Sequence, residues 1–348
     1  MIQLRSRQLP KEIVRPARIR GILISLLGSL LVVFGANLAA INYMQKAGIN
    51  WGDRIVAHKW HMLLDMKSPV DWLILGDSSG ATSVVPSILD GRLGGTSINL
   101  CTHGALGILN DAWMLDEYIQ RLGPPRHVLL VHCLCYTTIS HAADLSVYSM
   151  MQIPLSWGFW DRLEPRVLLP SGRVPEAFLD RYVPLYSHTD TLGSTLKNPW
   201  TAYKQDGPSF QDDGLLLVTG STPLQVEAQA AEYLSSITGT ESTPDAMAQQ
   251  TLEHIAALAE EFDFDVYLAS GPMYAGVYQD PGFQAYVSGV RDYLDAFTAS
   301  HKRVRHVLRA PITFPADQMQ TTSHPVASGA LMYTEQLVSE IMQCEESP

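Results

Sequence analysis

The sequence predicts an α/β protein with a doubly wound parallel sheet and one N-terminal transmembrane helix. Two observations predict this class. Short apolar segments typical of strands alternate at least five times with longer segments whose apolar residues recur at helical spacing. One uncharged stretch near the N-terminus is also long enough to cross a bilayer. Because crossovers between parallel strands are right-handed, helices should cover both faces of the sheet, and a functional site should form at the carboxyl ends of its strands.

Turn and capping signals divide the chain into these elements. The expected strands are 72–75, 96–102, 127–135, 265–273 and 303–312. The expected helices are 50–66, 86–93, 106–122, 244–262, 282–300 and 325–343. Thr243 is the expected N-cap of the fourth of these, because Pro244 suits a first helical position. Residues 137–240 are rich in Pro, Trp, Tyr and Ser and predict an insertion over the sheet rather than a separate domain.

The N-terminal stretch predicts a membrane anchor. Residues 21–44 contain no charged side chain, which is enough helix to span a hydrocarbon core of about 30 Å. A cleaved signal peptide is the alternative, since several alanines lie near the end of the stretch. Lys and Arg are more frequent in residues 1–20 than after the stretch. The positive-inside rule therefore predicts a cytoplasmic segment 1–20 and an extracytoplasmic domain 45–348.

Composition narrows the classes of function. The 348 residues are enough for one large α/β domain with an insertion. The net charge of −11 argues against a nucleic-acid partner, because phosphate contacts need Lys and Arg. Four cysteines are too few for a disulfide scaffold, and Cys133 and Cys135 have no His or Cys partners at zinc spacing. We therefore expect buried free thiols, no metal and no cofactor.

Three loops carry residues suited to nucleophilic chemistry. Ser78 follows the first strand, Gly104 follows the second, and His324 precedes the last helix. These loops should leave the same edge of the sheet, where a hydroxyl, a base and an oxyanion amide could meet. In the alternative interpretation Ser78 or Ser79 only caps a helix. Asp77 is expected to be a structural acid that accepts backbone amides in the turn.

The same segments resemble a known superfamily. "LILGDSSGA" resembles the first block of the SGNH/GDSL hydrolases, "INLCTHGALG" is similar to the second, and "SHPVASGALMYTEQL" resembles the last. The resemblance covers about 70–135 and 245–343. It implies a flavodoxin-like SGNH domain with Ser78 as nucleophile, Gly104 as an oxyanion amide and His324 as base.

The sequence departs from that pattern in two places. The family has an Asp three residues before the His, where this chain has Thr321. The nearest acid is Asp317, which we expect to accept the other ring N–H of His324, with a backbone carbonyl as the alternative. The Gly-x-Asn-Asp of the third block is also absent. His132 or Tyr136 would then help the oxyanion amides, and His103 would form a pocket wall.

These features predict an enzyme that handles acyl esters. An N-terminal anchor is similar to the branch linked to O-acylation of extracytoplasmic polysaccharides. That similarity implies an esterase or O-acyltransferase with an acyl-ester or glycan substrate and a membrane-bound acyltransferase as a partner. The alternative is a non-catalytic relative that binds glycan or scaffolds a membrane acylation complex, which the two departures favour.

Overall fold

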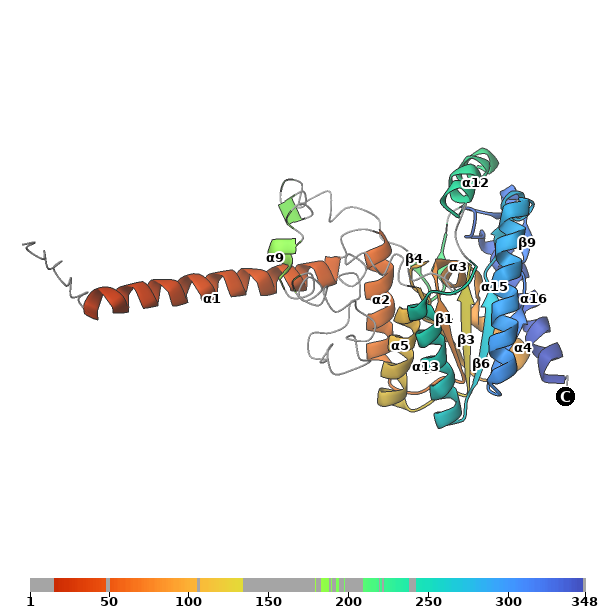
Figure 1. Cartoon of the computed structure of the whole chain (residues 1–348), viewed down its shortest axis with the longest axis horizontal. Helices are drawn as coiled ribbons and strands as arrows, with labels where there is room; N and C mark the ends of the chain where they lie inside the picture. The colour runs from red at the N-terminus through yellow and green to blue at the C-terminus, as the bar shows by residue number, and fades with distance from the viewer. Residues whose placement is uncertain are drawn as a thin grey trace, which may run out of the picture.

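Five parallel strands form the central sheet in the computed structural model (Figure 1). The structure describes residues 16–47, 51–104, 107–133, 209–218, 222–237 and 242–346, with scattered positions between 179 and 220. The strands are β1 (Trp72–Gly76), β2 (Ser97–Asn99), β3 (His127–His132), β6 (Asp265–Ser270) and β8 (Val304–Leu308). Their order is β2-β1-β3-β6-β8, and every neighbouring pair is parallel. This is the flavodoxin-like doubly wound order, so the predicted α/β class is confirmed.

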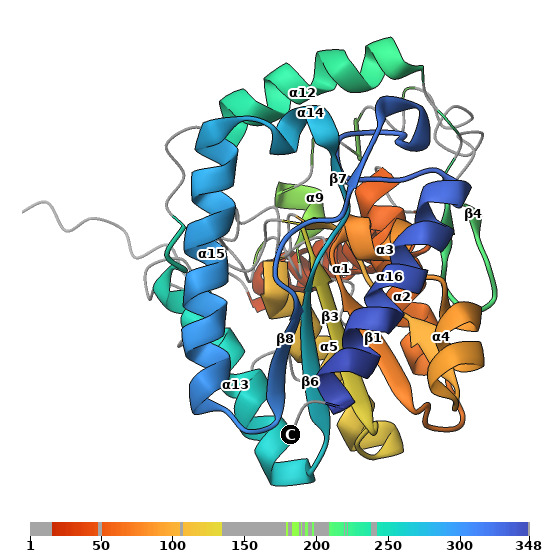
Figure 2. The same ribbon diagram turned by 90° about the vertical axis from the view of Figure 1, so that its right-hand side faces the viewer.

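Helices cover both faces of this sheet, as Figure 2 shows. One face packs on α5 (Gly107–Leu122), α13 (Ala246–Phe262) and α15 (Pro281–Ser300). The other packs on α3 (Ser78–Ser83), α4 (Pro86–Leu93) and α16 (Ala327–Glu346). β1 and β3 are almost wholly buried because neither face meets solvent, which explains their unbroken apolar runs.

Several predicted boundaries need correction. The predicted strands 96–102 and 303–312 end at Asn99 and Leu308, and two further differences have a clear physical cause. The predicted strand 265–273 ends at Ser270, because Pro272 cannot donate to a strand ladder. After it, β7 (Met273–Tyr274) pairs in parallel with β9 (Thr313–Phe314) in a separate two-stranded sheet. The N-cap of α13 is Asp245 rather than Thr243, since the Asp245 carboxylate accepts the Ala248 amide at 2.8 Å.

The N-terminal segment forms a long helix that extends away from the sheet (Figure 1). Within α1 (Pro16–Ala47), Arg20–Asn42 is apolar and long enough to cross a membrane, and its large apolar side chains except Ile41 are exposed. The next helix, α2 (Trp51–Asp65), instead buries Val56 and Trp60 in the domain core. Among the residues that the structure describes, one helix therefore has the length and composition of a membrane span.

Parts of the predicted insertion are described. They are the short helix α9 (Pro184–Ser187), the hairpin of β4 (Ser209–Phe210) and β5 (Leu216–Leu217), and α12 (Pro223–Ile237). α12 lies beyond the carboxyl ends of the strands, where it packs on α14 (Ala275–Tyr278) and the 3-10 helix Ala316–Gln318 (Figure 2). This part of the insertion therefore lies over the edge that holds the predicted site.

Candidate active site

The turn after β1 presents Ser78. Gly76 adopts a φ of +145°, and a Cβ there would lie 2.0 Å from the Val131 carbonyl oxygen, so only glycine fits. Asp77 then caps α3, and its Oδ1 accepts the Ser79 amide at 2.8 Å. The cap is therefore the acid, as expected of a structural Asp77. The Ser78 side chain is half-buried and does not serve as the helix cap.

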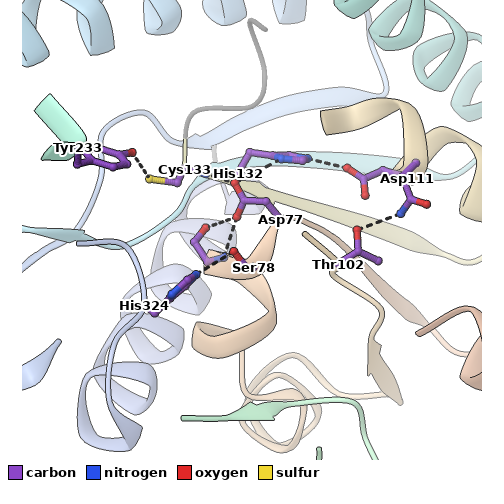
Figure 3. Close-up of polar contacts among 10 residues, drawn as sticks. Asp77, Ser78, Thr102, Asp111, His132, Cys133, Tyr233 and His324 are labelled. Atoms are coloured by element: carbon purple, nitrogen blue, oxygen red, sulfur yellow. Dashed lines mark hydrogen bonds and ion pairs between the residues drawn. The ribbon is translucent and has the colours of Figure 1, made fainter. Parts of the chain in front are cut away.

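A second turn carries His324 to the same edge. The Gln320 amide donates to the His324 carbonyl at 2.7 Å, and this turn leads directly into α16. α16 is tied to the end of α3, because the Thr334 hydroxyl donates to the Ser83 carbonyl at 2.7 Å. His324 Nε2 consequently lies 2.8 Å from Ser78 Oγ, although 246 positions separate the two residues (Figure 3). The structure thus brings the predicted nucleophile and base together.

The other ring nitrogen of His324 faces a hydroxyl. Thr321 Oγ1 lies 2.9 Å from His324 Nδ1 and also accepts the His324 amide at 3.2 Å. The prediction for Asp317 was wrong, since Asp317 is exposed in the 3-10 helix and does not reach the ring. The tight turn puts the residue three positions before His324 beneath its ring. The side chain at position 321 therefore faces the ring nitrogen.

His324 is neutral at physiological pH. Burial lowers the pKa of His324 to about 4, with a further lowering from His103, while the negative charge of Asp77 opposes the shift. A neutral imidazole can accept the Ser78 proton, which is the task of a general base. The Thr321 hydroxyl can either donate or accept, so it holds the ring without imposing one tautomer as a carboxylate would.

A buried acid–histidine–acid cluster lies behind the Ser78 turn (Figure 3). His132 Nε2 lies 2.6 Å from Asp111 Oδ2, and His132 Nδ1 lies 3.7 Å from Asp77 Oδ2. All three side chains are buried. The prediction that His132 helps to stabilise the oxyanion is therefore corrected. The His132 ring, at the end of β3, points to the α5 face, and both of its nitrogens face carboxylates.

The two acids of this cluster differ in charge behaviour. Burial alone would raise the pKa of Asp77, but His132, the Ser79 hydroxyl and the Cys133 amide hold it well below its usual range. Asp77 is therefore ionised at neutral pH. Burial raises the pKa of Asp111, and the neighbouring His132 only partly offsets that shift.

The loop after β2 lies beside the Ser78 turn. The Thr102 amide donates to the Gly76 carbonyl at 2.8 Å, so His103 and Gly104 follow at the edge of the site. Both are half-buried, and the influence of His103 on the pKa of His324 agrees with its expected place in the wall. The oxyanion role of Gly104 stays a prediction. Tyr136 lies outside the described residues.

Asp111 was not among the predicted site residues, although the sequence holds a signal for it. It occupies the same face of α5 as Ile108, Ala112 and Leu115, all of which are buried in the core. An ionisable residue on an otherwise apolar helix face needs a buried partner, and that partner is His132.

Comparisons with known proteins do not assign a family. No protein-family model matches the chain, and no curated protein matches it significantly. Within the described ranges, no group of three or more His, Cys, Asp or Glu side chains is arranged to hold a metal ion.

Proposed function

We propose that the protein is a membrane-anchored serine esterase or O-acyltransferase of the SGNH type. The observation that carries this proposal is the 2.8 Å contact between Ser78 Oγ and the neutral His324 ring. A hydroxyl next to an imidazole base is the minimal unit of nucleophilic acyl transfer. The sequence blocks around Ser78, Gly104 and His324 support the same assignment, and so does the strand order.

The geometry suggests a two-step reaction. The Ser78 hydroxyl passes its proton to His324 Nε2 while Oγ attacks the ester carbonyl carbon. The amides of Ser78 and Gly104 would hold the resulting oxyanion, and the imidazolium would protonate the departing alkoxide to leave an acyl-enzyme. In the second step His324 takes a proton from the acceptor, whose oxygen attacks the acyl carbonyl. The bond between the acyl carbon and Ser78 Oγ then breaks, and His324 returns the proton to Oγ, which restores the resting site. Water as acceptor gives an esterase, and a sugar hydroxyl gives a transferase.

The N-terminal helix suggests the setting of this reaction. Arg20–Asn42 would anchor the chain, and the basic residues before it favour a cytoplasmic N-terminus with an extracytoplasmic domain. An active site in that place would act on acyl esters of a glycan or another cell-envelope polymer. A membrane-bound acyltransferase is the partner that could supply the acyl group.

One observation favours a second candidate. The partner of His324 Nδ1 is the neutral Thr321 hydroxyl, whereas serine hydrolases that use a triad have a carboxylate there. A non-catalytic protein that binds glycan or scaffolds an acylation complex would tolerate this change.

An ester assay separates the two candidates. The full chain in detergent is incubated with p-nitrophenyl acetate and, separately, with a fluorophosphonate probe. Ser78→Ala and His324→Ala should each lower the hydrolysis rate by about 1,000-fold or more. Neither of these two variants should carry the fluorophosphonate probe, which the wild type should carry on Ser78. Ser328→Ala changes an exposed serine on α16 and serves as the control. Equal rates in wild type and Ser78→Ala would exclude the catalytic assignment.

A further inference from the structure

The proposed reaction requires a negative charge near His324. When Ser78 attacks, the His324 ring becomes an imidazolium, and Thr321 cannot offset that charge because its hydroxyl is neutral. The groups that face His324 come from three elements: Ser78 on α3 with Asp77 before it, His103 after β2, and Thr321 in its own turn. Of these, Asp77 is the acid.

We infer that Asp77 supplies this charge through space, and that His132 and Asp111 are positioning residues that hold it in place. This inference rests on the proposed function. It assigns no proton transfer to Asp77, which stays ionised while the Ser78 proton moves to His324 Nε2. The cluster behind the Ser78 turn would thus replace the orienting carboxylate that position 321 lacks.

The Asp77 carboxylate is fixed at both oxygens. Its Oδ1 accepts the Ser79 amide and hydroxyl, and its Oδ2 accepts the Cys133 amide at 2.8 Å and faces His132 (Figure 3). The side chain is buried, so water screens its charge little. A carboxylate that cannot rotate needs no reorganisation when charge develops on the neighbouring ring, which is the condition for electrostatic catalysis.

The charge of the cluster does not depend on which side of the His132–Asp111 contact their shared proton lies. If the proton resides on Asp111, which then donates a hydrogen bond to neutral His132 Nε2, the cluster carries one negative charge, located on Asp77. If that proton resides on His132, two carboxylates and one imidazolium again sum to one negative charge. Both arrangements fit the 2.6 Å contact between His132 and Asp111. Asp77 thus remains ionised wherever this proton lies.

The field of Asp77 reaches His324. The negative charge of Asp77 raises the pKa of His324, against the lowering by burial and by His103. The same interaction that favours the imidazolium in the resting protein would favour it in the transition state. A purely structural cap would need the amide contacts of Asp77 but not its charge.

A double-mutant cycle tests this inference. Thr321→Asp places a carboxylate at His324 Nδ1, so it should make the charge of Asp77 largely redundant. In the wild-type background Asp77→Asn should lower kcat/KM for p-nitrophenyl acetate by about 30-fold, equivalent to about 2 kcal/mol. In the Thr321→Asp background the loss should shrink to about 3-fold or less. Asp77→Asn should also move the acid limb of the pH profile to lower pH.

Controls separate charge from architecture. Thr334→Val removes the hydrogen bond that ties α16 to the end of α3 but leaves the contacts of Asp77 intact, so its cost should be the same in both backgrounds. If Asp77→Asn does not fold, Asp111→Asn tests the same cluster from α5, and Thr321→Asp should again reduce its cost. Equal costs of the Asp77 or Asp111 change in both backgrounds would overturn the inference alone. A wild type that neither hydrolyses the ester nor carries the probe on Ser78 would instead overturn the proposed function.

Discussion

Replacing Lys59 by Met should abolish one part of the pH dependence of stability. Lys59 lies on α2 and is fully buried. Its ammonium donates to the carbonyl of Asn99 at 2.6 Å and to that of Gly214, and it thereby ties α2 to β2 and to the hairpin of β4 and β5. Burial lowers the pKa of Lys59 from 10.5 to about 7, although the nearby Cys101 and Asp213 oppose the shift.

The sign and size of the effect follow from these two pKa values. Between pH 7 and 10.5 the unfolded chain binds a proton at Lys59 that the folded chain has largely lost, so stability rises with pH. From pH 7 to pH 9 this group alone should add about 2 kcal/mol to the free energy of unfolding. The comparison stops at pH 9, because burial raises the pKa of Cys101 above its ordinary value of 9.0. Above that pH most of the unfolded thiol is ionised while the folded thiol is not, which lowers the stability of wild type and variant alike.

Urea unfolding of the detergent-solubilised full chain measures this difference. The fluorescence of the buried Trp60 and Trp72 reports the transition at pH 7 and at pH 9. The wild type should gain about 2 kcal/mol between the two values, and Lys59→Met should lose this gain. Lys302→Met, which changes an exposed lysine, should keep it. The same pH dependence in Lys59→Met and wild type would refute a lowered pKa at Lys59.

Three further predictions concern the site and its turn. Because the pKa of His324 is lowered to about 4, kcat/KM for p-nitrophenyl acetate should be constant from about pH 6 to 8. It should fall to half of this plateau at about pH 4, and a half-maximum near pH 6.5 would contradict the lowered pKa. Thr321→Val removes the partner of His324 Nδ1 and should lower kcat by about 10-fold. Thr321→Ser keeps the hydroxyl and should retain most of the activity. An equal loss in both variants would show that the hydroxyl does not matter. Gly76→Ala should destabilise the protein by about 3 kcal/mol or more, because its Cβ would meet the Val131 carbonyl. Gly91→Ala in α4 has free space around it and should be neutral or stabilising in the same thermal-unfolding measurement, and a Gly76→Ala variant as stable as Gly91→Ala would refute the steric reasoning.

The architecture and the two principal residues of the candidate site could be predicted from the sequence. A buried strand is a short unbroken apolar run, and a helix that packs on a sheet repeats apolar residues at helical spacing. These patterns were enough to predict β1, β3 and α5. The meeting of Ser78 and His324 followed from topology, since loops at the carboxyl ends of parallel strands share one edge. These features depend on local patterns and on the few ways that a parallel sheet can be wound.

The groups that surround those two residues could not be predicted from the sequence, because they depend on how separate elements pack. The turn before α16 selected Thr321 over Asp317, because hydrogen bonds within a few residues set which side chain lies beneath the His324 ring. The pairing of His132 with Asp111 likewise required β3 and α5 to be packed in one register. Such contacts join side chains from separate elements at ångström precision, and residue periodicity holds no information at that scale.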